Sequence, residues 1–353
     1  MKRIIFTFLL LLVTVVTFAV DNLFQAGGVD NNWSTVGNWS QGTVPTSTDG
    51  YVTRFDATSP NCTVIGTIFA NHINFTGYTG TITMTASDMY VYGNITLSAT
   101  MTTVGAGRYL NAVMNGTLTS NGQNMVWGLS IYQTNHINIF ADDWTVPVLR
   151  INGGGTCTMN GSNIYVTGNL LQTTAAICTG TTNIIMNGTG SWSNSSTGQL
   201  RNNITINTAG TITISGTVYY NTGTLTYTAG TIVNTGSTLN VGTCTLDLND
   251  ITLNNFNVNV ASAVVTLASG FKIAGQLTSS VTGSSIVSSV GGTLRKITLL
   301  AGMTTPINAT NNIDATDIDS RDGYPVQSIG AVLSNTFNWY ARALSSDFLI
   351  MFE

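Results

Sequence analysis

The residues best suited to chemistry lie close together in the first half of the chain. Asp142 and Asp143 are adjacent carboxylates, and Arg150 follows them. Enzymes that cleave polysaccharides need clustered carboxylates, and some use Arg or Lys as the base. Aromatic and imidazole side chains nearby could hold a sugar ring. The candidate ligand-binding residues are Trp127, His136, Asp142, Asp143, Trp144 and Arg150.

The same stretch argues against catalysis. Successive residues of a strand point to opposite faces of a sheet, so Asp142 and Asp143 would not converge on one bond. Acid–base groups are also scarce, because no Asp or Glu occurs between Trp144 and Thr245 and Glu353 is the only glutamate. We therefore expect no catalytic residue and no cofactor. Carbohydrate binding or polysaccharide cleavage stays as the alternative function.

A second group of carboxylates lies near the C-terminus and raises the question of calcium. Calcium takes about six to eight oxygen ligands, to which these side chains could contribute. Their spacing does not follow the EF-hand loop, and glycine-rich calcium repeats are absent. We expect a solvated turn and no metal. The residues that would bind calcium in the alternative interpretation are Asp314, Asp317, Asp319 and Asp322.

The chain has four cysteines, at positions 62, 157, 178 and 244. No CxxC pair occurs and no His adjoins a Cys, so a metal site is not supported. Cys157 and Cys178 are about one turn of the predicted repeat apart, and stacked strands lie about 4.8 Å apart, within disulfide reach. Two interpretations stay open: a disulfide between these two residues, or buried thiols that pack as small apolar groups.

The stretch Gly210–Asp250 indicates the architecture that would position these groups. Every second residue of its short runs is apolar, as with Ile212 and Ile214 or Leu246 and Leu248, which is typical of half-buried strands. Recurrent Gly-Thr pairs between the runs predict turns. Three such strands make a turn of about 20 residues, and the turns stack. The prediction is an all-β fold, a single-stranded parallel β-helix or β-solenoid, with a cap at each end.

Residues 1–19 are predicted to be a secretory signal peptide. A basic start, Met1-Lys2-Arg3, precedes an apolar run that ends in Thr17-Phe18-Ala19, with small residues at the cleavage positions. The alternative is a short uncleaved anchor. After cleavage we expect a secreted, extracellular or cell-surface chain with no membrane segment.

The mature chain is predicted to have three parts. Residues 20–60 form an N-terminal cap, in which Trp33, Trp39 and Phe55 would cover the open edge of the first turn, with a sugar-stacking platform as the alternative. Residues 61–300 form the solenoid. Residues 301–353 form a C-terminal β cap or assembly segment, whose last strand, Phe348–Phe352, would cap its own chain or insert into a neighbour.

The residues that follow the predicted signal peptide contain a motif that is similar to one in a known group of proteins. Asn38-Trp39-Ser40, Gly42, Val44-Pro45, Asp49, Val52 and Phe55 form a pattern that resembles the opening of secreted right-handed parallel β-helix proteins of environmental bacteria and phages, including autotransporter-like passenger regions. The segments 74–84, 313–320 and 335–339 are similar to the first turns and the closing turns of such proteins. The resemblance implies a surface or virion structural role and transfers no catalytic residue.

The low content of charged residues limits the kinds of partner that the chain could bind. Charged residues make up 7% of the chain, against roughly 25% in ordinary globular domains, and the net charge is −4. Without a basic stripe, we expect no nucleic-acid partner. The favoured function is a non-catalytic structural or adhesive rod, with self-association through its ends or its C-terminal strand, or contact with a surface glycan.

Overall fold

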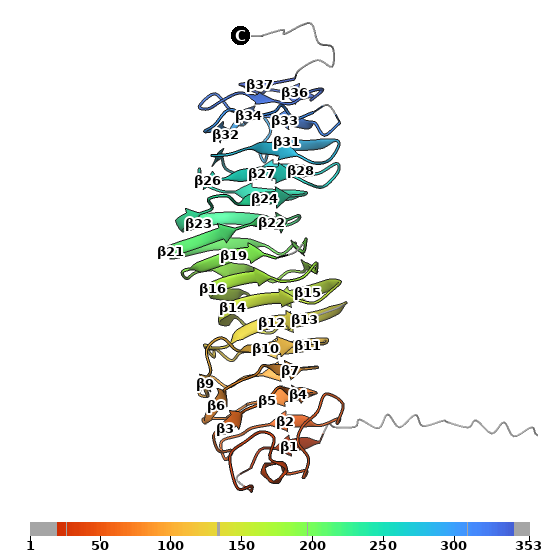
Figure 1. Cartoon of the computed structure of the whole chain (residues 1–353), viewed down its shortest axis with the longest axis vertical. Coiled ribbons are helices and arrows are strands. Elements are labelled where there is room, and N and C mark those ends of the chain that lie inside the picture. Colours follow the sequence, from red (N-terminus) through yellow and green to blue (C-terminus); the bar gives the residue numbers. More distant parts are fainter. Residues whose placement is uncertain (1–19, 26, 133–134, 196, 309, 342–353) are drawn as a thin grey trace, which may run out of the picture.

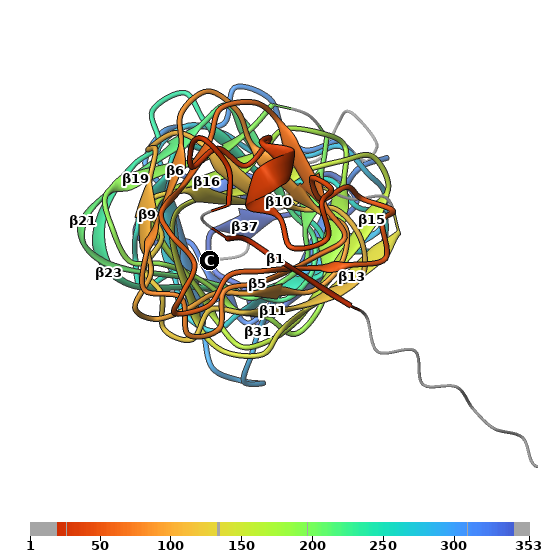
Figure 2. The ribbon, with the colours of Figure 1, turned by 90° about the horizontal axis from the view of Figure 1, so that it is seen from below.

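The chain is a stack of parallel strands. The computed structural model describes residues 20–341, apart from 26, 133–134, 196 and 309. These residues form an all-β solenoid of about 13 turns, with β1 at one end and β37 at the other (Figure 1). Viewed along the stack, the turns overlie one another around a common centre (Figure 2). The predicted parallel β-solenoid is confirmed.

Two large sheets run along most of the stack, and three smaller sheets contain the remaining strands. The first large sheet contains, in order, β1 (Asp21–Leu23), β2 (Val52–Arg54), β5 (His72–Asn74), β8 (Ile95–Thr96), β11 (Gly116–Thr119), β13 (His136–Phe140), β15 (Thr156–Gly161), β17 (Ile177–Thr179), β20 (Gln199–Leu200), β22 (Thr217–Tyr220), β24 (Thr238–Val241), β27 (Asn255–Val258) and β30 (Leu277–Ser279).

The second large sheet contains β4 (Ile68–Ala70), β7 (Met89–Val91), β10 (Tyr109–Ala112), β12 (Gly128–Tyr132), β14 (Trp144–Asn152), β16 (Ile164–Gln172), β18 (Ile184–Met186), β19 (Gly190–Asn194), β21 (Ile204–Ser215), β23 (Thr224–Val233), β25 (Cys244–Asp247), β28 (Val264–Leu267), β31 (Ser284–Ser288), β33 (Ile313–Thr316) and β36 (Leu333–Ser334).

The smaller sheets contain β3 (Cys62–Val64), β6 (Thr81–Met84) and β9 (Thr102–Val104); β26 (Thr252–Leu253), β29 (Phe271–Ile273), β32 (Arg295–Leu299) and β34 (Ile318–Asp319); and β35 (Val326–Gln327) and β37 (Trp339–Tyr340). The helical content of the described residues is one short 3-10 helix, η1 (Val36–Asn38), and none of their helices is long and apolar enough to cross a membrane.

The alternation seen in the sequence places one side of each strand in the core. In the second sheet, Leu225, Leu246 and Leu267 are register partners on successive turns, and all three are buried. The residues between them in each strand face outward. Each turn therefore adds one inward layer to a continuous hydrophobic core, and the backbone hydrogen bonds of each turn are completed by its neighbours.

Two glycines predicted to lie in turns lie inside strands instead. Gly210 is within β21 and Gly230 is within β23, where the pairing of these long strands shifts register between Asn207 and Thr211. The strand bends at this irregularity without leaving the ladder. A side chain at Gly210 would meet the Thr189 hydroxyl oxygen of the turn below at 2.0 Å from its Cβ, so the bend requires glycine.

Aromatic side chains fill the N-terminal end. Trp33, Trp39 and Phe55 are buried together with Phe24, and the Trp33 and Trp39 ring centroids are 4.9 Å apart. The Trp39 indole N–H donates to the Trp33 carbonyl at 2.7 Å. These rings close the bottom of the core, since Phe55 continues the stack onto Phe75 at 4.9 Å.

The parallel ladder extends beyond the range 61–300 at both ends. β1 and β2 are the first two strands of the first large sheet, and β33 to β37 continue the stack above residue 300. The predicted signal peptide, 1–19, and the apolar C-terminal strand, Phe348–Phe352, lie outside the described residues.

Candidate functional site

Neither tryptophan proposed for ligand binding can contact a ligand. Trp127 and Trp144 are both fully buried. The Trp127 indole N–H donates to the Val104 carbonyl at 2.8 Å, and the Trp144 indole N–H to the Leu118 carbonyl at 3.4 Å. Their rings occupy inward positions, so the prediction that they hold a sugar is corrected: they are core residues.

The two adjacent carboxylates tie three turns together. Asp142 and Asp143 lie in the corner between β13 and β14 rather than within a strand. The Asp142 carboxylate accepts hydrogen bonds from the backbone N–H groups of Ser120 and Asn121 in the turn below, both at 2.6 Å. The Asp143 carboxylate accepts from the backbone N–H of Asn163 at 2.9 Å, in the turn above. The two groups therefore face opposite directions along the stack.

The two remaining members of the predicted group lie on different faces. His136 is on β13 of the first large sheet, with Cys157 as its register partner. Arg150 is on β14 of the second large sheet. The predicted group is therefore not one site, because neighbours in sequence are carried around a corner of the solenoid.

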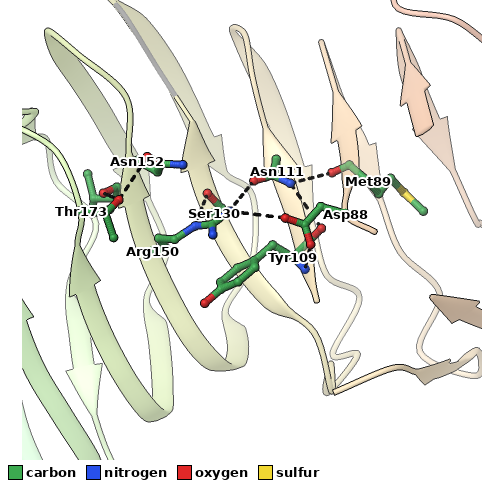
Figure 3. Close-up of polar contacts among 9 residues, drawn as sticks. Asp88, Met89, Tyr109, Asn111, Ser130, Arg150, Asn152 and Thr173 are labelled. Atoms are coloured by element: carbon green, nitrogen blue, oxygen red, sulfur yellow. Dashed lines mark hydrogen bonds and ion pairs between the residues drawn. The ribbon is translucent and has the colours of Figure 1, made fainter. Parts of the chain in front are cut away.

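Arg150 forms a different cluster, which we call the arginine clamp: Asp88, Tyr109, Asn111, Ser130 and Arg150 (Figure 3). The Arg150 guanidinium donates to Ser130 Oγ at 3.2 Å and to Asn111 Oδ1 at 3.0 Å, lies 3.6 Å from the Tyr109 ring centroid, and pairs with Asp88 Oδ2 at 3.6 Å. The Asn111 amide in turn donates to the Met89 carbonyl at 3.1 Å. The clamp thus joins β14 to the three turns below it.

Beside the clamp lies a group of outward-facing rings, which we call the aromatic stripe: Phe69, Tyr90, Tyr92 and Tyr132. Phe69 on β4 is 43% exposed, and Tyr132 on β12 is 41% exposed. The Tyr90 ring lies 5.6 Å from Phe69 and 5.9 Å from Tyr132, and Tyr92 lies 6.4 Å from Phe69, centroid to centroid. Tyr90 and Asn111 are register partners, so stripe and clamp adjoin on one outer face.

The clamp influences the stripe electrostatically. Partial burial, and then the negative charge of Asp88, raise the pKa of Tyr90, while Arg150 opposes this change. The Tyr90 hydroxyl therefore remains protonated and able to donate a hydrogen bond at neutral pH.

The stripe is not recognisable in the sequence because its members resemble core residues. Phe69 stands between Ile68 and Ala70, and Tyr90 between Met89 and Val91, so each strand reads as wholly apolar. A comparison of outward positions one turn apart could have found the stripe. One residue of the sequence indicates how the Tyr109 ring packs. Gly128 leaves room for this ring, because a Cβ at this position would lie 2.6 Å from a Tyr109 ring carbon.

The four aspartates considered for calcium have separate partners. Asp314 accepts from the Val332 backbone N–H at 2.7 Å, and Asp322 pairs with Lys296 at 2.6 Å. Arg321 binds Asp319 through two hydrogen bonds, at 3.0 and 2.7 Å. No group of three His, Cys, Asp or Glu side chains among the described residues is arranged to hold a metal ion.

Asp317 and Asp319 are held in their charged forms by hydrogen bonds. The Asn335 amide and then the backbone N–H of Gly292 lower the pKa of Asp317. The Arg321 guanidinium lowers the pKa of Asp319. Asp317 therefore links residues of neighbouring turns near the C-terminal end, and Asp319 holds the corner that follows β34 through Arg321.

The cysteines divide into a bonded pair and two buried thiols. Cys157 on β15 and Cys178 on β17 are register partners joined by a disulfide, with Cα atoms 4.7 Å apart. Cys62 and Cys244 are buried, and burial raises the pKa of both thiols, that of Cys244 to about 12. Neither is a thiolate at neutral pH, so both behave as core residues.

Comparisons of this chain with protein-family models, with curated proteins and with solved structures found no match. Its function is therefore inferred from its own residues and their arrangement.

Proposed function

We propose that this protein is a non-catalytic extracellular rod with a structural or adhesive role. The observation that carries the proposal is the unbroken parallel ladder, which joins all its turns into one elongated body (Figure 1). About 13 turns at about 4.8 Å per turn give a rod roughly 60 Å long. A stiff body of this kind holds what is attached at its ends or along its faces at a fixed distance.

The polar residues support this role because their hydrogen bonds join one turn of the solenoid to the next. Asp142 and Asp143 bind backbone groups of the turns below and above, and Arg150 bonds to residues of the three turns below it. Thr158 and Thr179, stacked one turn apart, share a hydrogen bond at 3.3 Å. A surface stabilised by neutral Thr and Asn contacts needs few charges, in agreement with a charged fraction of 7%.

The extracellular location is part of the proposal and rests on the sequence of residues 1–19 and on the cysteines. A disulfide such as Cys157–Cys178 persists in oxidising compartments. The same location belongs to the secreted parallel β-helix proteins of bacteria and phages that the N-terminal motif resembles. We propose the same class of surface or virion component for this chain.

Self-association through the ends is consistent with a structural rod. Near the C-terminal end, Val332 is 70% exposed, Tyr324 53% and Phe337 38%. Exposed apolar side chains beside a terminal strand favour contact with another chain. We propose that this end joins a second copy or an anchoring partner.

Polysaccharide cleavage has less support. A hydrolase places two carboxyl groups across one glycosidic bond, about 5–9.5 Å apart. Asp142 and Asp143 instead bind backbone groups in opposite directions, so neither is directed toward a shared substrate position.

Electron microscopy of the secreted full chain, together with an assay of reducing ends released from polysaccharides, tests the proposal. We expect rods of about the stated length, single or joined end to end, and no release. Turnover that disappears in Asp142→Asn or Asp143→Asn would overturn the proposal and restore the catalytic alternative. Compact or flexible particles in place of rods would also overturn it.

A further inference from the structure

The aromatic stripe is not required by the solenoid. The stack is held by its backbone ladder, its inward layers and the polar contacts between turns, and the outward rings of the stripe belong to none of these. On the next four turns, the positions in register with Phe69 and Tyr90 are Asn111, Ser130, Arg150 and Leu171, and none of them is a ring. Rings gathered on one short part of an outer face expose apolar surface without a folding reason, which marks a binding surface.

The stripe is narrow and short, and its rings are inclined to one another by 34° to 84°. Its rings come from β4, from β7 and the residue that follows it, and from β12, with β10 between, so it spans about 14 Å along the rod. Four rings of about 200 Å² each, none more than 43% exposed, offer at most roughly 350 Å². A stable protein interface needs about 600 Å² or more from each partner, so a protein partner would find too little surface here.

The clamp adjoins the stripe and balances the charge of this face. Tyr90 is in register with Asn111, whose fully buried amide is held by Arg150 and by the Met89 carbonyl. The positive charge of Arg150 is matched by Asp88, in the same ion pair. The face therefore presents no net charge that would attract a polyanion or a polycation.

Polar groups border the rings. No hydrogen bond to the hydroxyl groups of Tyr90, Tyr92 or Tyr132 occurs within the described part of the chain, so these groups are available to a ligand. Tyr132 is in register with Asn152, which accepts a hydrogen bond from Thr173 at 3.1 Å. The rings thus combine apolar faces with polar rims on a surface that already carries hydroxyl and amide groups.

We infer that the aromatic stripe binds an uncharged polysaccharide that lies along the rod. A sugar ring has an apolar face of C–H groups and a rim of hydroxyl groups, which matches rings of Tyr and Phe bordered by hydrogen-bonding groups. An open surface with rings at several inclinations suits successive sugars of a linear chain, whereas a small molecule needs an enclosed pocket. The inference rests on the adhesive part of the proposed function and names its ligand class.

Affinity electrophoresis of the full secreted chain tests this inference, with hydroxyethyl cellulose, xyloglucan, barley β-glucan and galactomannan as uncharged probes and alginate as a charged one. We expect retardation by at least one uncharged probe and none by alginate. Tyr90→Ala combined with Tyr132→Ala should weaken that binding by about tenfold or more, equivalent to about 1.4 kcal/mol. Tyr165→Ala combined with Tyr219→Ala, outward tyrosines elsewhere on the rod, is the matched control and should change binding less than twofold.

Thermal melts of both double variants establish that each is folded. The inference is overturned if no uncharged probe retards the chain, if alginate binds better, or if the stripe variant binds as well as the control. Sedimentation velocity adds a further check, because a dimer that only the stripe variant abolishes would make a second copy the occupant and would also overturn it. Rods that form normally but bind no uncharged polysaccharide would leave the scaffold proposal standing.

Discussion

Replacement of Arg150 by alanine should destabilise the lower half of the rod. The change leaves Asn111 Oδ1 without its donor inside a fully buried residue, at a cost of about 1–3 kcal/mol. Loss of the guanidinium from the Tyr109 ring removes about 0.5–1 kcal/mol more. The ion pair with Asp88 is partly exposed and adds almost nothing. The sum is about 3 kcal/mol.

Urea unfolding followed by tryptophan fluorescence measures this loss, because Trp127 and Trp144 are buried in the turns that the clamp joins. Stacked repeats can unfold in parts, so hydrogen exchange of the strands from β10 to β14 should report the same loss locally. Arg150→Lys keeps the charge but not the planar fork, and should recover only a small part of the stability.

The matched control is Arg108→Ala. Arg108 is half-buried, and the hydrogen bond that its guanidinium donates to the Thr85 carbonyl at 3.1 Å is exposed to solvent, so its loss should cost about 1 kcal/mol or less. If Arg150→Ala unfolds at the same urea concentration as Arg108→Ala, the clamp contributes nothing and the reasoning is refuted.

Three further predictions concern other parts of the rod. Cys157→Ser combined with Cys178→Ser should lower stability by about 3 kcal/mol in urea unfolding, whereas an unchanged midpoint would contradict a disulfide there. The Asn335 amide lowers the pKa of Asp317, so the stabilisation by this carboxylate is complete above the ordinary aspartate pKa of 3.8 and is lost as the pH falls through the lower pKa of the folded chain. The protection factors of the last turns, that is, their hydrogen exchange relative to the intrinsic rate at each pH, should therefore fall below about pH 4 in the native chain, and this pH dependence should be weaker in Asp317→Asn. Removal of residues 342–353 should reduce end-to-end association in sedimentation velocity, and filaments of unchanged length would exclude that segment from the contact.

The local sequence determined the fold. Inward and outward positions follow from the pleat of a strand, so the alternation at Leu246 and Leu248 predicted which side chains are buried. The recurrence of about 20 residues predicted stacking, because a half-buried strand with no helix beside it must pair with its own repeats. The burial of Trp33, Trp39 and Phe55 at the first turns could likewise be anticipated from the need to cover an open core.

Only the tertiary structure decided which outward residues meet. Met89, Leu110, Leu129 and Leu149 are successive register partners, and the spacing between them changes from turn to turn. The number of residues in each corner between strands sets that spacing. This number depends on local bends of the backbone that the alternation within strands does not encode.

Arg150 illustrates the difference. From its neighbours in sequence it was grouped with Asp142 and His136, but the corner at 141–143 sends its strand onto another face, toward Asp88 and Asn111 of earlier turns. Alternation along one strand is a local property of the backbone and can be read from the sequence. The lateral register of distant turns is the sum of every corner between them, and for that reason the clamp and the stripe became visible only once the chain was coiled.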